Sequence, residues 1–530
     1  MDVAGNLTVA DLLRFQVERN PDRDFLVFES DSGAVASLTY RAVSDRVYKL
    51  ANYLVAQGVK SGDKIAVMLA NSPEFVIAWF AIHAVGAVTV PVNTLYSVDE
   101  LAFLLDHSDS VGIVIEPRFL PTLRDAVGAR DCLPIRVLAR SDRAPEDFVT
   151  LADVEANASA SDPFVRVAPE SVAQIIYTSG TTSRPKGAML SHRSSVTQGA
   201  AIAMLFSLRS TDRCCITLPL FHVNGQFVSL LPALTAGATV VLLETFSARK
   251  FWRQVQTHRS TVISIVPMIL RTLLSQPIRA DDSLHSLRFS FYALPTASEE
   301  WEAFERRFGV TLVEGYGLSE TFGICCSNPP VYGRVKRHCI GLPILGRVLR
   351  VVDDDMNERP AGEIGQIAVR GEPLFVGYYK DEASTRACMR DGWFLTGDNG
   401  SVDEDGYFHF FDRSKDVIKR AGENVAATEV ERVVSGHPAV LECAVIGVFD
   451  PLRDEAVKAY VVMKPEQSLT EEEVKAWCAA YLAKFKVPEF VEFRHELPKT
   501  SIGKIMKYEL RAQHRAAADV VRQQILEGGN

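Results

Sequence analysis

Residues 172–187 read VAQIIYTSGTTSRPKG, and this stretch is the strongest single signal in the sequence. Its first half is a short apolar run, typical of a strand that is buried on both faces in a parallel sheet. Small hydroxyl residues, a glycine and Lys186 follow directly. In such a loop the backbone N–H groups approach a polyphosphate closely, and the lysine adds a positive charge. The stretch therefore predicts a buried strand leading into a phosphate-binding loop. It is not a Walker A loop, because the lysine precedes the second glycine.

Helical and strand patterns alternate on both sides of this stretch. Helical patterns cover 40–57 and 98–107, and strand patterns cover 64–68, 111–115, 239–242 and 262–265. The run 75–92 has no formally charged side chain, but Gly86 and Pro91 divide it into a helix-like half and a β-branched half. A buried helix followed by a buried strand explains that division better than a membrane span does. The alternation predicts an α/β fold with parallel-rich sheets covered by helices.

The pattern of expected secondary structure changes twice further along the chain. Short alternating runs and many glycines from about 341 to 413 predict a small antiparallel β unit, with a hairpin turn at Asp405-Gly406. A second α/β rhythm follows, with helix-opening capping boxes expected at Thr428 with Glu431 and at Thr470 with Glu473. We therefore predict a large N-terminal domain over 1–413 and a smaller, mobile C-terminal α/β domain over 414–530.

Composition narrows the classes of protein to which the chain can belong. There are 57 Lys plus Arg and 66 Asp plus Glu, so the formal net charge is 57 − 66 = −9. This acidic balance argues against a nucleic-acid partner. The nine cysteines are scattered and odd in number, which favours a reducing compartment over a disulfide framework. The N-terminus has no basic and apolar leader, so we expect a cytoplasmic protein.

Four further motifs follow the phosphate loop in order: EGYGLSET at 314–321, WFLTGD at 393–398, Asp412-Arg413, and PKTSIGK at 498–504. With these motifs the whole chain resembles the adenylate-forming superfamily, which includes acyl-CoA synthetases, adenylation domains of peptide synthetases and firefly luciferase. The C-terminal part carries KRAGEN at 419–424, RDEAVKA at 453–459 and AKFKVP at 483–488. With these segments it resembles CoA-forming members, in particular crotonobetaine/carnitine–CoA ligase and more generally medium- to long-chain acyl-CoA synthetases.

The resemblance implies a role for each motif residue. Lys504, His222, Glu320 and Lys419 would be catalytic, with Glu320 also holding Mg²⁺. Lys415 would be the hinge between two domain orientations. The implied nucleotide-binding residues are Thr178, Ser179, Gly180, Thr181, Thr182, Lys186, Glu314, Tyr316, Ser319, Asp398 and Arg413. The implied acyl- and CoA-binding residues are His222, Asn224, Tyr292, Gly315, Lys419 and Gly422.

We accordingly expect an ATP-dependent acyl-CoA synthetase that forms an acyl-adenylate, releases pyrophosphate and transfers the acyl group to CoA. Its expected partners are a small carboxylic acid, ATP and CoA, and it would be a monomer or homodimer. One alternative is an adenylating ligase that loads the phosphopantetheine of a carrier protein, and another is a non-catalytic nucleotide-binding protein. The sequence leaves open whether the acid is fatty, aromatic or carnitine-like.

Lys504→Ala should abolish adenylate formation while largely sparing thioester formation from supplied acyl-adenylate. The reason is that Lys504 would neutralise charge that develops only while pyrophosphate leaves. Pyrophosphate exchange and single-turnover thioester formation measure the two half-reactions separately. Equal loss in both would contradict the assignment.

Overall fold

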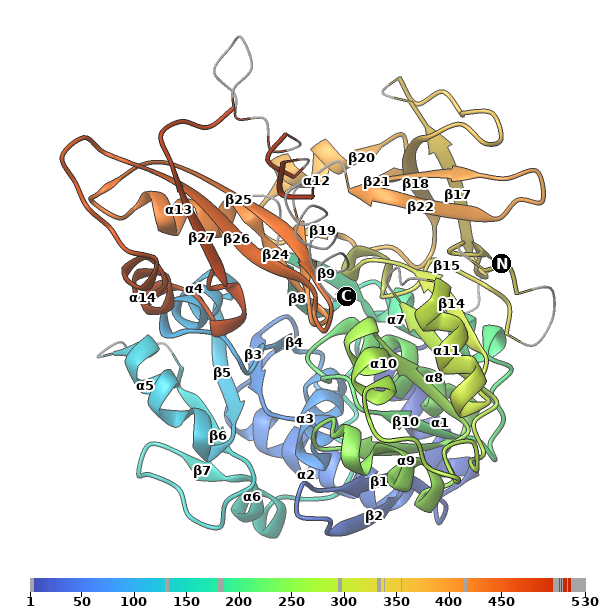
Figure 1. Ribbon diagram of the computed structural model, residues 1–530. Coiled ribbons are helices and arrows are strands. Elements are labelled where there is room, and N and C mark those ends of the chain that lie inside the picture. Colours follow the sequence, from blue (N-terminus) through green and yellow to red (C-terminus); the bar gives the residue numbers. More distant parts are fainter. Residues whose placement is uncertain are drawn as a thin grey trace. The chain divides into compact units, whose positions relative to one another are not determined.

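The computed structural model describes residues 4–128, 133–178, 185–293, 298–330, 335–337, 339–353, 355–413, 417–498, 505, 507, 509–511 and 513–515. They form two compact units (Figure 1). Unit 1 contains 4–94, 101–178 and 186–413, and unit 2 contains 95–100, 185 and the residues from 417 onward. The predicted division of function between 1–413 and 414–530, and the predicted mobility, remain predictions.

The first large sheet of unit 1 has nine strands in the order β16-β15-β14-β13-β12-β10-β11-β1-β2. Its middle strands are parallel, and β2, β15 and β16 add antiparallel edges. The strands are β1 (Asp24–Glu29), β2 (Val35–Thr39), β10 (Arg213–Ile216), β11 (Thr239–Leu243), β12 (Val262–Ile265), β13 (Phe289–Ala293), β14 (Leu312–Tyr316), β15 (Cys326–Ser327) and β16 (Leu342–Pro343).

The second large sheet has eight strands in the order β19-β9-β8-β4-β3-β5-β6-β7. Strands β8 to β7 are parallel, whereas β9 and β19 are antiparallel to their neighbours. The strands are β3 (Lys64–Met68), β4 (Val88–Pro91), β5 (Ser110–Ile115), β6 (Ile135–Leu138), β7 (Val149–Thr150), β8 (Val172–Thr178), β9 (Lys186–Ser191) and β19 (Gly377–Tyr378).

The described helices that precede residue 389 belong to unit 1, except that α4 begins within the segment 95–100 of unit 2. They are α1 (Val9–Arg19), α2 (Tyr40–Ala56), α3 (Pro73–Ala84), α4 (Val98–Ser108), η1 (Pro117–Phe119), α5 (Leu120–Val127), α6 (Leu151–Asn157), α7 (His192–Leu205), η2 (Asn224–Leu230), α8 (Leu231–Ala236), α9 (Ala248–Thr257), α10 (Pro267–Leu274), α11 (Ser298–Phe308), η3 (Ser319–Thr321) and α12 (Glu382–Cys388). The predicted buried helix and strand within 75–92 are confirmed as α3 and β4. Pro73 and the Ser72 N-cap start α3, and no residue of β4 is exposed. No helix in the described ranges is both long and apolar enough to cross a membrane.

The predicted antiparallel β unit is confirmed as a five-stranded sheet with the hairpin turn at Gly406, whose φ is 82°. Its strands are β17 (Arg347–Val352), β18 (Gly365–Gly371), β20 (Met389–Arg390), β21 (Trp393–Val402) and β22 (Phe408–Arg413).

Unit 2 has a sheet in the order β24-β23-β26-β25, with β27 beside β26. Its elements are β23 (Val417–Arg420), β24 (Glu423–Ala426), α13 (Ala427–Ser435), β25 (Val440–Asp450), β26 (Asp454–Met463), α14 (Glu471–Tyr481), η4 (Lys484–Lys486) and β27 (Phe490–Arg494).

One capping box is confirmed and the other is wrong. Thr470 caps α14, and the Glu473 carboxylate accepts from the Thr470 backbone N–H. Thr428 instead lies inside α13, which begins at Ala427, and the Glu431 carboxylate accepts from the Val445 N–H of β25. The spacing of residues predicted both capping boxes. Glu431 does not cap its own helix, because its carboxylate is bonded to a strand that is distant from the helix start.

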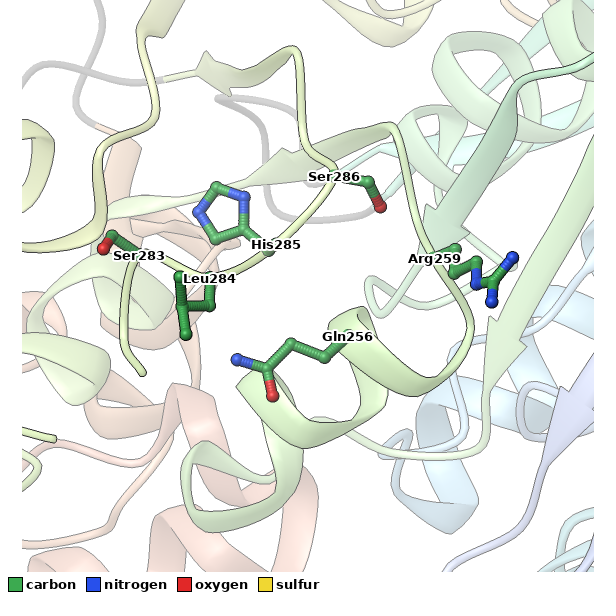
Figure 2. Close-up of a pocket in the computed structure, with 6 residues that line it drawn as sticks. All are labelled: Gln256, Arg259, Ser283, Leu284, His285 and Ser286. Carbon is green, nitrogen blue, oxygen red and sulfur yellow. The ribbon is translucent and has the colours of Figure 1, made fainter. Parts of the chain in front are cut away.

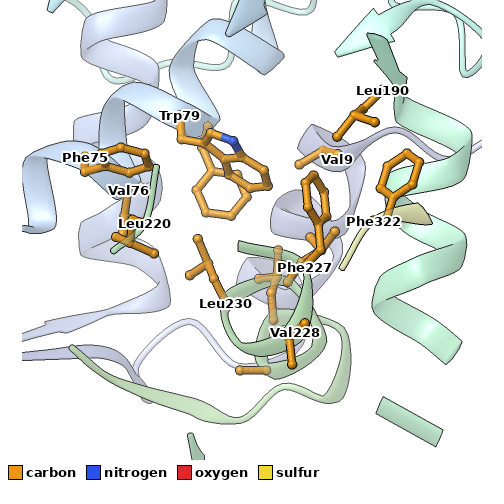
Figure 3. Close-up of a cluster of buried hydrophobic side chains, with 14 of the residues drawn as sticks. Val9, Phe75, Val76, Trp79, Leu190, Leu220, Phe227, Val228, Leu230 and Phe322 are labelled. Atoms are coloured by element: carbon orange, nitrogen blue, oxygen red, sulfur yellow. The ribbon is translucent and has the colours of Figure 1, made fainter. Parts of the chain in front are cut away.

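A buried chain of hydrogen bonds connects β8 of the second large sheet to η2 and to the loop that follows β10 of the first large sheet. Trp79 Nε1 of α3 donates to Gln174 Oε1 of β8 at 2.7 Å, and Gln174 Nε2 donates to Gln226 Oε1 of η2 at 2.7 Å. Gln226 Nε2 then donates to the Leu220 carbonyl at 2.6 Å. The chain runs through an apolar cluster in which Trp79 lies near Phe227 (Figure 3).

Gln174→Leu should lower the free energy of unfolding by about 2–6 kcal/mol, because the Trp79 N–H and the Gln226 carbonyl would each lose a partner worth about 1–3 kcal/mol. Urea unfolding measures this change, and Gln57→Leu at an exposed position is the matched control. Equal stability of the two variants would show that the chain of amides does not stabilise the core.

Candidate active site

The predicted phosphate loop lies between two antiparallel strands. β8 ends at Thr178 and β9 begins at Lys186, and these two residues are partners in the antiparallel register. The intervening Ser179, Gly180, Thr181 and Thr182 lie outside the described residues. Because β8 belongs to a parallel sheet, the loop leaves its carboxyl end, which is where ligands bind in open α/β sheets.

Lys186 is held close to the base of this loop. Its Nζ donates to Ser384 Oγ at 2.5 Å and lies 3.9 Å from the Asp381 carboxylate. The same Nζ lies 5.1 Å from the centre of the Tyr378 ring, within the range of a cation–π contact. The positive charge predicted for phosphate binding is therefore positioned by α12 and its N-cap.

Tyr378 connects Lys186 to the predicted metal ligand Glu320. Tyr378 pairs with Ala188 between β19 and β9, and its hydroxyl donates to Glu320 Oε1 at 2.7 Å. The Glu320 carbonyl accepts from the Phe375 N–H at 2.9 Å. Sequence reasoning missed Tyr378, because the neighbouring tyrosines at 378 and 379 match no motif and Glu320 lies 58 positions away.

Glu320 is the residue that the resemblance assigns to Mg²⁺, and this role remains a prediction. Glu320 is buried, and Tyr378 occupies one of its carboxylate oxygens. The described ranges contain no group of three or more His, Cys, Asp or Glu side chains placed to hold a metal ion. Mg²⁺ commonly uses one or two carboxylates and takes its other ligands from phosphates and water.

A buried arginine supports the segment that carries Glu320. Arg347 Nη2 of β17 donates to the Thr321 carbonyl at 2.7 Å and to Gln198 Oε1 at 3.4 Å. Burial lowers the pKa of Arg347 to about 10. The short helical turn η3, which begins at Ser319, is thus fixed at its carboxyl end by a residue that sequence reasoning also missed.

Tyr316 and Asp398 come together from β14 and β21. The Tyr316 hydroxyl donates to Asp398 Oδ2 at 2.6 Å, and Asp398 is only 1% exposed. Burial, followed by the negative charge of Asp398, raises the pKa of Tyr316 well above its usual value. Asp398 also lies opposite Arg413 in the β21–β22 register, although the Arg413 side chain lies outside the described residues. Two predicted nucleotide-binding residues therefore form one buried pair.

The other predicted residues of β13 and β14 are tightly packed. Glu314 is buried and lies beside Tyr292 in register, and Tyr292 packs edge-on against Trp301. A Cβ atom at Gly315 would lie 2.5 Å from the Phe291 ring, so only glycine fits there. The roles predicted for these residues in nucleotide and acyl binding remain predictions.

The His222 loop is held by side-chain amides on both sides of Leu220. Asn71 Oδ1 accepts from the Leu220 N–H at 2.8 Å, while Gln226 donates to the Leu220 carbonyl. The half-buried His222 follows two residues later, and Asn224 starts the π-helical turn η2. π-Helical turns often occur at functional sites.

Unit 2 carries the turn predicted to serve the CoA step. β23 ends at Arg420 and β24 begins at Glu423, so Ala421 and Gly422 form a two-residue turn with φ values of 52° and 87°. Positive φ at both positions is typical of a type I′ hairpin. Lys419 is the third residue of β23. Lys415 and Lys504 lie outside the described residues.

A shallow hollow of about 510 Å³ lies elsewhere on unit 1 (Figure 2). It is lined by Gln256, Arg259, Ser283, Leu284, His285 and Ser286. None of these is a predicted site residue, and four of the six are exposed. The hollow is therefore separate from the candidate active site.

Comparison with protein families now decides the identity of the chain. The AMP-binding enzyme family matches residues 13–379, and the AMP-binding enzyme C-terminal domain matches residues 429–504. The chain belongs to the AMP-binding enzyme family. This confirms the resemblance predicted from the five motifs.

Individual relatives agree with the family. The chain is 37% identical over 524 residues to crotonobetaine/carnitine–CoA ligase of Salmonella paratyphi A, covering 96% of this chain and 100% of the relative. It is similar to a structure of o-succinylbenzoate CoA synthetase from Bacillus subtilis, with 26% identity, a TM-score of 0.83 and coverage of 94% and 98% of the two chains. It is also similar to the amide bond synthetase McbA from Marinactinospora thermotolerans, with 27% identity, a TM-score of 0.85 and coverage of 96% and 99%.

These comparisons confirm the predicted reaction class. This AMP-binding enzyme is an ATP-dependent carboxylic acid–CoA ligase that forms an acyl-adenylate and then transfers the acyl group to CoA.

Asp398→Ala should weaken ATP binding and also destabilise unit 1. The ATP effect would arise because the ribose hydroxyls lose an acceptor, at about 1.5–3 kcal/mol per charge-assisted hydrogen bond. The stability effect would arise because the Tyr316 hydroxyl loses its partner. Calorimetry and urea unfolding measure the two changes.

The double variant Asp398→Ala/Tyr316→Phe separates the two roles. It should recover part of the lost stability, because no buried hydroxyl is left unpaired, and it should not recover ATP affinity. Recovery of both together would mean that Asp398 acts only as the structural partner of Tyr316.

Proposed function

We propose that this ligase activates a short carboxylic acid of the carnitine type, with a quaternary ammonium group, in preference to a long-chain fatty acid. The Phe291 ring fills the space beside Gly315, where a Cβ atom would lie 2.5 Å from it. A Cβ atom at Gly323 would likewise lie 3.2 Å from Val228. We expect this packing to limit the room for a long acyl chain, and the packing beside Gly315 is the observation on which the proposal rests.

The similarity to crotonobetaine/carnitine–CoA ligases supports a quaternary ammonium acid as the first choice within the short acids. Aromatic rings are suitable partners for such a cation, because the face of the ring carries negative electrostatic potential. Phe227, three residues after the predicted acyl-binding residue Asn224, lies edge to face with Phe322, and the two ring centres are 5.1 Å apart. Short aromatic acids are the second choice.

In the first half-reaction, the site residues would bring two anions together. Lys186 and the loop after β8 would bind the phosphates, Tyr316 and Asp398 would position the adenosine, and Lys504 would neutralise charge between the carboxylate and the α-phosphate. Glu320, positioned by Tyr378, would hold Mg²⁺, which supplies further charge neutralisation at the phosphates. His222 would lie beside the acyl carboxylate.

In the second half-reaction, the turn at Lys419 to Gly422 would border the pantetheine arm of CoA. Gly422 suits a close approach of a ligand to the backbone, since it has no Cβ. Lys415 would act as the hinge between the two steps.

The eight cysteines in the described ranges are all free thiols, which supports a cytoplasmic location.

A pyrophosphate-release screen with matched acids tests the substrate proposal. The panel contains carnitine, crotonobetaine, the neutral analogue with a tert-butyl group in place of trimethylammonium, benzoate, octanoate and palmitate. We expect the highest kcat/KM for one of the two betaines, with the neutral analogue lower by about tenfold or more, or about 1.4 kcal/mol, if a cation–π contact contributes.

Phe291→Ala should shift the preference toward octanoate. The change removes the ring beside Gly315, and each methylene accommodated in an apolar pocket is worth about 1–3 kcal/mol. A wild-type enzyme that prefers palmitate, or a Phe291→Ala variant with an unchanged chain-length profile, would contradict the proposed acyl pocket.

A further inference from the structure

Glu455, in unit 2, is hydrogen-bonded to the turn that the proposed function assigns to the CoA step. Glu455 is the second residue of β26, and its Oε2 accepts from the Lys419 backbone N–H at 2.7 Å. Neither strand register nor a helix cap requires this bond, because β23 and β26 pair through Arg420 and Asp454. The carboxylate therefore reaches sideways to hold the strand just before the turn.

Gly447 of β25 makes room for this carboxylate. A Cβ atom at Gly447 would lie 2.5 Å from Glu455 Oε1, 2.6 Å from Cδ and 2.8 Å from Oε2. Real Cβ atoms do not approach other atoms so closely, so any other residue at 447 would push the carboxylate aside. The Gly447 φ is not in the left-handed region, so close packing and not backbone conformation explains this glycine.

The turn itself needs external support. Ala421 has a φ of 52°, which costs a residue with a Cβ roughly 1–2 kcal/mol. Its N–H donates to the Arg453 carbonyl at 2.7 Å, so Arg453 and Glu455 hold alternate backbone N–H groups of the segment Lys419–Ala421. Strained conformations persist only where the surroundings fix them, and they cluster at functional sites.

Arg420 fixes the other side of the same segment. Its guanidinium donates to the carbonyls of Phe485 and Val487 and, at 2.7 Å, to Glu489 Oε2. Arg453 Nη1 donates to that same Glu489 oxygen at 2.8 Å. The residues between Lys419 and Gly422 are therefore held from two directions.

Burial disfavours the charged form of the Glu455 carboxylate. Burial raises the pKa of Glu455 above its usual value, and the charge of Asp454 raises it further; the Lys419 N–H and the charges of Lys419 and Arg511 oppose the shift. An apolar side chain would avoid the desolvation cost but would leave the Lys419 N–H without this acceptor.

We infer that Glu455 is a positioning residue for the CoA-dependent half-reaction, fixing the Lys419–Gly422 turn through the Lys419 N–H, in the space that Gly447 provides. Glu455 acts through the turn and does not itself contact a substrate. This inference rests on the proposed role of the turn in the CoA step.

Two half-reactions measured on the full chain test the inference. Acid-dependent ATP–pyrophosphate exchange reports adenylation, and single-turnover conversion of preformed acyl-adenylate reports acyl-CoA formation. Glu455→Ala should lower the rate of acyl-CoA formation by about tenfold, or about 1.4 kcal/mol, and leave pyrophosphate exchange unchanged. Glu455→Gln should retain most of the rate, because the amide carbonyl accepts the same N–H. Glu472→Ala, at an exposed position of α14, is the matched control.

Gly447→Ala should slow acyl-CoA formation as Glu455→Ala does, because the added methyl group displaces the Glu455 carboxylate from the Lys419 N–H. The double variant Gly447→Ala/Glu455→Ala should lose no more activity than either single variant, because truncating Glu455 removes the clash. Additive losses would overturn the inference, as would equal losses in both half-reactions or a Glu455→Gln variant as slow as Glu455→Ala. If the wild-type protein itself makes no acyl-CoA from acyl-adenylate, the proposed role of the turn fails before any variant is compared.

Discussion

A hydrogen-bonded chain of buried side-chain amides links β8 of one large sheet of unit 1 to η2 and to the loop that follows β10 of the other sheet. Gln174 lies on β8, which leads into the phosphate loop, and Gln226 lies on η2, which follows His222. Each amide in an apolar core needs partners for both its oxygen and its nitrogen, so the two sheets can pack in few alternative registers. The same bonds that satisfy the core therefore fix the distance between the predicted phosphate-binding and acyl-binding segments.

Much of the fold could be predicted from local pattern. The strand predicted at 64–68 is β3, and the helix predicted over 40–57 is α2 at Tyr40–Ala56, because hydrophobic period and caps are local properties. The motifs named Tyr316 and Asp398, which the structure brings together as one buried pair, while their roles in nucleotide binding remain predictions. The capping box predicted at Thr428 was wrong. Glu431 had the spacing of a capping partner, but its carboxylate accepts a hydrogen bond from the distant strand β25.

The residues that were missed are those whose partners are distant in sequence. Tyr378 lies 58 positions from Glu320, and Asn71 lies 149 positions from Leu220. Neither has a neighbour pattern that distinguishes it from an ordinary tyrosine or asparagine. Their importance comes from tertiary contacts, which hold the predicted site residues in place. Sequence reasoning thus found residues that belong to family motifs more readily than the residues that support them.

Asn71 has a consequence for how the large unit folds. Its amide donates to the carbonyl of Leu218, two residues after β10, and to the carbonyl of Leu243, the last residue of β11, while Asn71 itself follows β3 of the other sheet. Neither sheet can open alone without leaving buried amide and carbonyl groups unpaired. The two sheets should therefore behave as one cooperative foldon, with amide protons on β3 and β10 exchanging with solvent through the same global opening.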